Sequence, residues 1–168
     1  MRRLAVALSV AAAASLLPSA ALAAAQPPAG AKLGRLVIRA IGLNTPYFQG
    51  DWALCKGDQS TTTNYGPAAY PCSSGNTVAL AGHRTTRSRP FRWIDRLKPG
   101  YVIKRVTPGE GTVLYRVTGS RIWPSSVDFD TAVTGPPLAK RLVLTTCNPP
   151  GSDAQRLVVY AWEVPKRK

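Results

Sequence analysis

Short apolar runs alternate along the chain with stretches rich in glycine, proline and polar residues. The runs are five to seven residues long and rich in valine, leucine, isoleucine and threonine, which is typical of β-strands. They predict strands at 35–39, 77–83, 101–106, 112–117, 141–146 and 156–162. Because 14 glycines and 15 prolines separate these short strands, the pattern favours an all-β fold, either a closed barrel or a sandwich.

Helical periodicity is found in one segment. Phe91, Ile94 and Leu97 recur every third residue and predict a short helix over 90–97, which ends before the Pro-Gly pair at 99–100. The fold class is therefore mainly β with short helices.

Two long stretches, 50–71 and 119–140, are polar and lack a strand pattern, so we expect loops there. Structureless loops of this length usually carry function or cover another part of the domain.

The N-terminus predicts export. Two arginines follow Met1, an alanine-rich apolar run extends from 4 to 25, and Ala-x-Ala sites close it, which is the layout of a signal peptide. The run is also long enough to span a bilayer as an uncleaved anchor. We expect a flexible Pro- and Gly-containing leader at 26–34 and one catalytic domain at 35–168, since 168 residues favour a single domain.

The charge is strongly positive, with 22 Lys and Arg against 8 Asp and Glu, for a net charge of +14, or +12 after removal of residues 1–25. This excess fits either general solvation of a basic domain or a polyanionic neighbour. For such a neighbour, export favours an anionic cell wall over nucleic acid, because the sequence carries no nucleic-acid-recognition motif. One histidine and three cysteines cannot form a zinc ribbon. We therefore expect no metal and no cofactor.

Export allows disulfides to persist. Cys55 and Cys72 lie in polar, loop-like surroundings 17 residues apart, and we expect them to form a disulfide worth about 3 kcal/mol. Cys147, at the end of a predicted strand, is then left as a free thiol.

A free thiol at a strand end is a candidate nucleophile. Arg156 follows Cys147 by nine residues and starts the next strand, so a strand–loop–strand return would place its guanidinium near the sulfur. There it would favour the thiolate and stabilise an oxyanion. His83, the only histidine, ends another strand and is the candidate proton donor and acceptor. The alternatives are a structural histidine, a buried structural cysteine and an arginine at the rim of the fold.

Chain order narrows the enzyme class. His83 precedes Cys147, whereas papain-like and NlpC-like peptidases carry the cysteine first. L,D-transpeptidases share the order, but their Ser-x-Gly-Cys segment is not matched by residues 145–148.

Three segments together resemble the sortase family. Leu144-Thr145-Thr146-Cys147 resembles the signature Thr-Leu-x-Thr-Cys, with Val143 in place of its first threonine. Arg156 lies where sortases carry their active-site arginine. The stretch 81–100 resembles the histidine region and the helix that follows it. The resemblance runs from about 36 to 164 and is most like class E, with class F as the alternative.

The resemblance implies a closed eight-stranded β-barrel and a cysteine transpeptidase. Cys147 would attack the Thr–Gly bond of a C-terminal sorting signal of the Leu-Ala-x-Thr-Gly or Leu-Pro-x-Thr-Gly type, forming a thioacyl enzyme. His83 would transfer protons, Arg156 would hold the substrate, and Thr145 and Thr146 would bind it. The thioacyl group would pass to an amine of a peptidoglycan precursor or a pilin, on the outer face of the membrane or in the cell wall of a Gram-positive bacterium.

Two other functions fit the same residues. A hydrolase would use water in place of the acceptor amine. A non-enzymatic, secreted β-domain would use its positive charge to bind anionic wall polymers.

Overall fold

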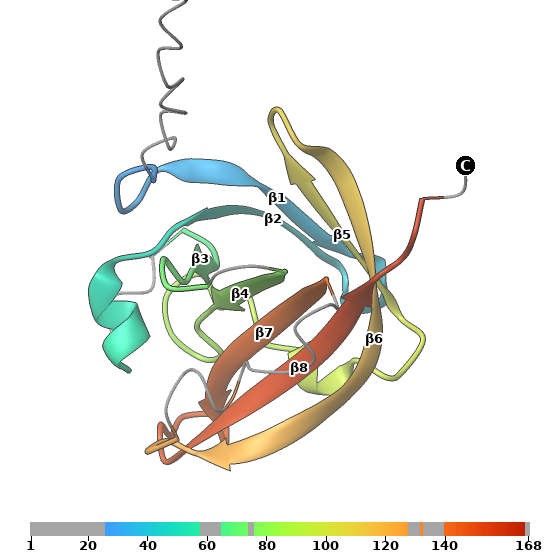
Figure 1. Cartoon of the computed structure of the whole chain (residues 1–168). Helices are drawn as coiled ribbons and strands as arrows, with labels where there is room; N and C mark the ends of the chain where they lie inside the picture. Colours follow the sequence, from blue (N-terminus) through green and yellow to red (C-terminus); the bar gives the residue numbers. More distant parts are fainter. Residues whose placement is uncertain (1–25, 58–64, 74–75, 128–131, 133–139, 167–168) are drawn as a thin grey trace, which may run out of the picture.

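The eight strands of the protein close into a barrel, as the computed structural model shows in Figure 1. Residues 26–57, 65–73, 76–127, 132 and 140–166 are described. Around the barrel the strand order is β1-β2-β3-β4-β7-β8-β6-β5. The expected all-β fold with a closed eight-stranded barrel is therefore confirmed.

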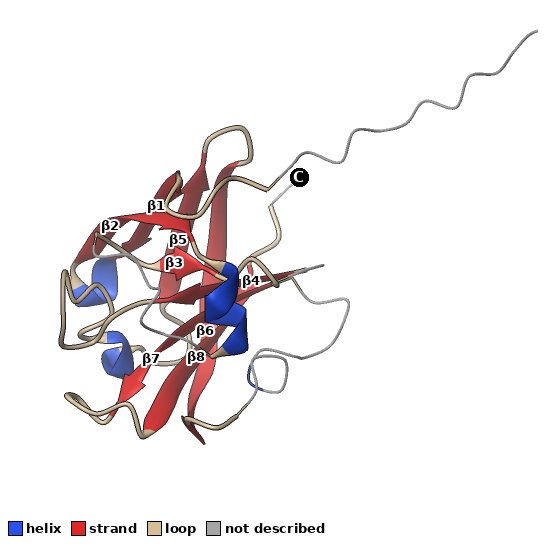
Figure 2. Cartoon of the chain, turned by 90° about the vertical axis from the view of Figure 1, so that its left-hand side faces the viewer, coloured by secondary structure: helices blue, strands red, loops and turns tan. Residues whose placement is uncertain are grey.

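The described helices are short and lie in the connections between strands, some of which are long, such as the one from β4 to β5 (Figure 2). The strands are β1 (Lys32–Ile38), β2 (Leu43–Gln49), β3 (Ala68–Ala69), β4 (Thr77–Ala81), β5 (Val102–Thr107), β6 (Gly111–Pro124), β7 (Arg141–Asn148) and β8 (Gln155–Glu163). The described 3₁₀ helices are η1 (Arg39–Ile41), η2 (Trp52–Lys56) and η4 (Ile94–Arg96).

The start of β1 corrects the expected leader. Lys32 already belongs to the strand, within the stretch 26–34 that we expected to be flexible. The Gly30 amide also donates to the carbonyl of Gln49, and the Gln49 amide donates to the carbonyl of Ala31. Pairing with β2 thus orders this stretch from Gly30 onward, despite its leader-like composition.

Strands β2 and β3 were not predicted. β2 contains Asn44, Thr45 and Pro46, which break its apolar pattern, and β3 has only two residues. β2 pairs antiparallel with β1 and parallel with β3, so its hydrogen bonds with neighbouring strands define it.

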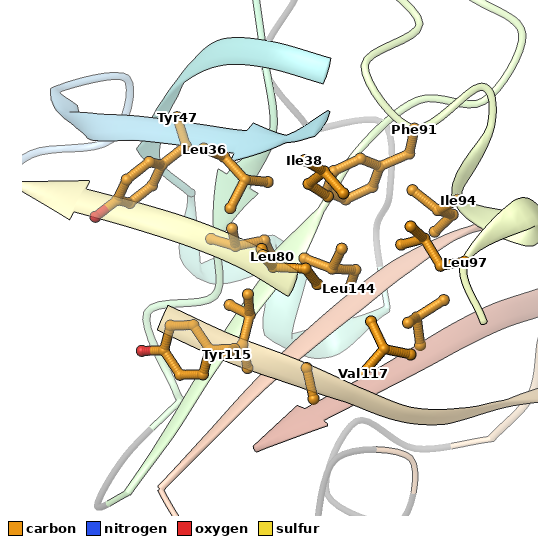
Figure 3. Packing of buried hydrophobic residues seen from close by; sticks show 14 of the residues in the cluster. Leu36, Ile38, Tyr47, Leu80, Phe91, Ile94, Leu97, Tyr115, Val117 and Leu144 are labelled. Atoms are coloured by element: carbon orange, nitrogen blue, oxygen red, sulfur yellow. The ribbon is translucent and has the colours of Figure 1, made fainter. Parts of the chain in front are cut away.

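The predicted helix over 90–97 is a series of turns that ends in η4. Phe91, Ile94 and Leu97 are all buried and point into the barrel, toward residues such as Ile38 and Leu144 (Figure 3). A spacing of three residues matches the three residues per turn of a 3₁₀ helix better than the 3.6 of an α-helix. The pattern identified the buried face correctly, while the helix itself is shorter than the predicted 90–97.

The two predicted loops also contain regular structure. β6 continues to Pro124, where it pairs with β8, so 119–124 is strand rather than loop. The stretch 50–71 holds η2 and β3. Pairing with neighbouring strands makes 119–124 and β3 strands, since the residues at 119–124 have little apolar alternation of their own.

Apolar side chains from all eight strands fill much of the interior, as the cluster in Figure 3 illustrates. A second cluster lies around β4, β7 and β8 and includes Leu54 of η2, together with Ala79, Val143 and Val158. The segment after β2 therefore packs on these strands and covers an apolar face that would otherwise meet water.

A polar cluster lies inside the barrel near the start of β7. Arg105 is 9% exposed, donates to the hydroxyls of Tyr47, Tyr115 and Thr107, and forms an ion pair with Glu110 at 3.0 Å. Burial raises the pKa of Tyr115, and the nearby Arg105 charge opposes that rise. The cluster borders a cavity of about 540 Å³.

Within the described part of the chain, no helix is long and apolar enough to span a membrane. Residues 1–25, where we expect the signal peptide or anchor, lie outside the described residues, and that expectation stays a prediction.

Candidate active site

Cys147 and Arg156 lie opposite each other on two antiparallel strands. They are register partners in the β7–β8 pair, and Arg156 Nη1 lies 3.9 Å from Cys147 Sγ. The same Nη1 donates to the carbonyl oxygens of Asp153 at 2.7 Å and Gln155 at 3.1 Å. These carbonyls hold the guanidinium at the end of the β7–β8 pair, where its positive charge lies close to the sulfur.

Cys147 is half-buried and free, while Cys55 and Cys72 form the disulfide that we expected. The Cα atoms of Cys55 and Cys72 are 6.0 Å apart, and the bridge joins η2 to the segment after β3. The one thiol left for chemistry is therefore that of Cys147.

His83 is carried to the same end of the sheet by the parallel pairing of β4 with β7. The Gly82 amide donates to the Thr145 carbonyl at 3.1 Å, and the Thr146 hydroxyl donates to the Gly82 carbonyl at 2.7 Å. His83 and Cys147 each come one residue later in the chain. The three candidate residues therefore come from, or directly follow, three adjacent strands.

Two contacts fix the histidine segment. His83 Nδ1 lies 3.1 Å from the Thr86 hydroxyl, and the His83 carbonyl accepts a hydrogen bond from the Phe91 amide at 3.1 Å. The contact with Thr86 orients the imidazole, and His83 is half-buried, so it is still partly accessible.

Thr145 and Thr146, which we expected to bind substrate, are 5% and 0% exposed. The Thr146 hydroxyl holds the Gly82 carbonyl, so in this structure it joins β7 to the histidine segment. Substrate binding by these two residues stays a prediction.

The end of β6 borders the site. Trp123 is the register partner of Arg156, and its indole N–H donates to the Tyr160 hydroxyl at 2.9 Å. That hydroxyl donates in turn to the carbonyl of Ala132. Within the long stretch 119–140, residues 128–131 and 133–139 lie outside the described residues.

Sequence reasoning missed three polar neighbours of the candidate residues, namely Arg84, Asn148 and Gln155. Arg84 lines a cavity of about 260 Å³ together with Trp93, Asp95 and Pro150. The signal that could have revealed them is their position, because each is adjacent in the chain to a candidate catalytic residue. No cluster of three or more His, Cys, Asp or Glu side chains that could hold a metal ion is found among the described residues.

A thiol beside a guanidinium, with an imidazole on the adjoining segment, supplies the groups for acyl transfer through sulfur. The thiolate attacks a carbonyl carbon, a positive donor stabilises the oxyanion, and an imidazole protonates the leaving amine.

Comparisons with known proteins identify the family of the domain. The family model of the Sortase domain matches residues 36–164. The chain is 30% identical over 106 residues to sortase SrtE1 of Streptomyces coelicolor, a match that covers 59% of this chain and 30% of that protein. The chain thus spans less than a third of the length of this curated relative.

Solved structures share the fold. Sortase A from Corynebacterium diphtheriae superposes with a TM-score of 0.67 at 18% identity, covering 82% of this chain and 63% of that one. Sortase C-1 from Actinomyces oris gives a TM-score of 0.64 at 24% identity, covering 79% and 73%.

Proposed function

Because this chain belongs to the sortase family, we propose that it is a cysteine transpeptidase with Cys147 as nucleophile, Arg156 as oxyanion and substrate donor, and His83 as general acid and base. The observation that carries the proposal is the 3.9 Å approach of the Arg156 guanidinium to the Cys147 sulfur, across paired strands. The parallel pairing of β4 with β7, which brings the His83 segment alongside, supports the third role.

In the first step the Cys147 thiolate attacks the threonine carbonyl of a sorting signal. The tetrahedral oxyanion is stabilised by Arg156, whose charge is permanent. The C–N bond to glycine breaks, and His83 in its protonated form gives its proton to the leaving amine. A thioacyl enzyme and a neutral His83 remain.

In the second step an acceptor amine attacks the thioester carbonyl and passes its proton to His83. The C–S bond breaks, the Cys147 thiolate is released, and an amide joins donor to acceptor. Each turnover restores the protonation states of both residues, so the enzyme is regenerated without a further co-reactant.

We further propose a Leu-Ala-x-Thr-Gly or Leu-Pro-x-Thr-Gly sorting signal and, as acceptor, an amine of a peptidoglycan precursor or a pilin. The relative from Streptomyces coelicolor, named SrtE1, favours class E over class F. Pilus-related sortase C of Group B Streptococcus is among the structural neighbours, and its name is the reason for including a pilin amine as acceptor.

The place of action is proposed to be outside the cytoplasm, at the membrane surface or in the cell wall of a Gram-positive bacterium. The Ala-rich N-terminal run and the Cys55–Cys72 disulfide support export, since disulfides persist in oxidising compartments.

The test is to trap an acyl adduct on Cys147 by mass spectrometry, comparing Leu-Ala-x-Thr-Gly with Leu-Pro-x-Thr-Gly peptides. Cys147→Ala is expected to abolish the adduct and the product. His83→Ala and Arg156→Ala are each expected to lower kcat/KM by roughly 10²–10⁴-fold. Arg116→Ala, which removes an exposed arginine from β6, is the matched control and keeps full activity.

Full activity in Cys147→Ala would end the proposal. Product analysis with and without a small amine separates transfer from hydrolysis. The absence of any adduct, together with salt-sensitive retention on cell walls, would favour the wall-binding β-domain instead.

A further inference from the structure

We propose that Arg84, Asn148 and Gln155 form a positioning network that holds the three candidate catalytic residues in register, with Arg84 as its anchor. The inference rests on the proposed function. Each member is the immediate chain neighbour of a candidate: Arg84 follows His83, Asn148 follows Cys147, and Gln155 precedes Arg156.

The network is a continuous chain of short polar contacts. Arg84 Nη1 donates to Asn148 Oδ1 at 2.6 Å, and Asn148 Nδ2 donates to Gln155 Oε1 at 2.8 Å. Arg84 Nη2 forms an ion pair with Asp95 Oδ2 at 3.1 Å. Since a guanidinium only donates, it fixes the carbonyl end of the Asn148 side chain toward Arg84 and the amino end toward Gln155.

Together with the hydrogen bonds of Gly82, these contacts link the two segments on both sides of His83 and Cys147. On the side before the pair, Gly82 is bonded to the Thr145 carbonyl and the Thr146 hydroxyl. On the side after it, Arg84 is bonded to Asn148. His83 and Cys147 are thus held between two cross-segment attachments, and neither segment can slide along the other without breaking one.

The same residues brace the Cys147–Arg156 pair. Asn148 and Gln155 are register partners in β7 and β8, directly next to Cys147 and Arg156. Their side-chain hydrogen bond adds to the strand pairing at the point where the two strands separate into the connecting loop. One network therefore spans all three segments.

Burial argues that Arg84 has a role other than stability. It is only 6% exposed, and its Nε is buried without a hydrogen-bond partner among the described residues. Its ion-pair partner Asp95 is 42% exposed, and an ion pair with one partner in water adds little stability. Arg84 instead fixes the relative positions of the groups that it contacts, which lie beside the candidate active site.

A comparable network at the start of β7 supplies the control. Arg105 is also buried, at 9% exposure, and is paired with a more exposed carboxylate, Glu110. It lines the cavity formed partly by Lys140, which precedes β7, whereas Cys147 lies near the end of that strand. Arg105→Met therefore removes a similar side chain far along β7 from the site.

The experiment measures kcat and KM for thioacyl formation with a Leu-Ala-x-Thr-Gly peptide, together with Tm. Arg84→Met and Asn148→Leu keep side-chain size and remove the contact. Each is expected to lower kcat by about 10–100-fold with KM within about twofold, because a displacement of about 1 Å can cost 10²-fold in rate. Asn148→Asp, which still accepts from Arg84 and can accept from the amide of a flipped Gln155, is expected to stay within about threefold of the parent.

Non-additive losses of kcat in a double variant would show that the residues act as one network. The Arg84→Met/Asn148→Leu double variant is expected to be no slower than the worse single variant, because both substitutions break the same Arg84–Asn148 link on which the network depends. Arg105→Met is expected to lower Tm while kcat per folded molecule is unchanged. If Arg84→Met does not fold, Asn148→Leu and Asn148→Asp carry the same test.

Unchanged kcat in Asn148→Leu would overturn the inference. So would additive losses, an Asn148→Asp variant as slow as Asn148→Leu, or an equal loss of kcat in Arg105→Met. All of these leave the proposed function intact so long as Cys147→Ala is inactive. Full activity in Cys147→Ala overturns the proposed function itself, independently of the network.

Discussion

At the scale of single residues, the packing of the segment that carries His83 depends on a glycine, Gly82. A Cβ atom on Gly82 would lie 2.6–3.0 Å from three ring carbons of Phe91, which is 0% exposed. Real Cβ atoms do not approach so closely, and a buried ring has little room to move. Gly82 therefore lets Phe91 pack against the segment that carries His83.

Gly82→Ala is expected to lower the free energy of unfolding by about 1–3 kcal/mol, because the added methyl group overpacks a filled core. It is also expected to lower activity, since His83 is the next residue. Gly119→Ala is the matched control: it adds the same methyl group in a strand where nothing lies within 4 Å. Urea denaturation of both variants measures the difference, and an equal effect at the two positions would contradict the argument.

At the scale of elements, the β7–β8 pair carries two of the candidate catalytic residues, and η2 packs against an apolar face of β4, β7 and β8. Leu54 of η2 is fully buried against that face. The Cys55–Cys72 disulfide ties η2 to the residues that follow β3. The disulfide thus secures η2 on the active-site strands without joining the active site.

Replacing Cys55 and Cys72 by serine is expected to destabilise the protein by about 3 kcal/mol and lower Tm by roughly 10 °C, because the unfolded chain gains loop entropy. The chemistry at Cys147 should remain. Calorimetry with and without reductant checks this, since reductant should lower the Tm of the parent protein and leave that of the variant unchanged. A parent Tm that does not respond to reductant would refute the prediction.

At the scale of the whole molecule, positive charge is largely uncompensated. The chain carries 22 Lys and Arg against 8 Asp and Glu. Among the described residues two ion pairs are found, Arg84–Asp95 and Arg105–Glu110. Exposed arginines such as Arg87, Arg89 and Arg92 add to the positive potential beside the histidine segment. Such a surface attracts any anionic polymer over distances set by salt.

Retention on anionic cell-wall polymers is therefore expected to fall steeply between 0.1 M and 1 M NaCl, as the Debye length shrinks from about 10 Å to about 3 Å. A co-sedimentation assay measures it. Cys147→Ala should bind like the parent, because it keeps all the exposed arginines and lysines. Arg87→Ser/Arg89→Ser and Lys104→Ser/Arg116→Ser each remove two charges and should weaken binding equally. Retention that does not depend on salt would contradict an electrostatic origin.

The sequence by itself determined the parts of this protein that are local. Apolar β-rich runs predicted the places of β4, β5, β7 and β8, although not their ends, because a strand with a buried face leaves a pattern in its own residues. The nine-residue spacing of Cys147 and Arg156 predicted their approach, since a short connection between adjacent strands leaves little choice of geometry. The polar, loop-like surroundings of Cys55 and Cys72 and their separation of 17 residues predicted the disulfide.

Tertiary structure alone decided what depends on a distant partner. The polar β2 and the two-residue β3 exist because neighbouring strands satisfy their backbone groups, and 119–124 joins β6 because β8 lies beside it. Above all, the parallel pairing of β4 with β7 joins segments 64 residues apart, as the Arg84–Asn148 contact shows. No local pattern specifies such a pairing, because its free energy comes from closing the whole barrel.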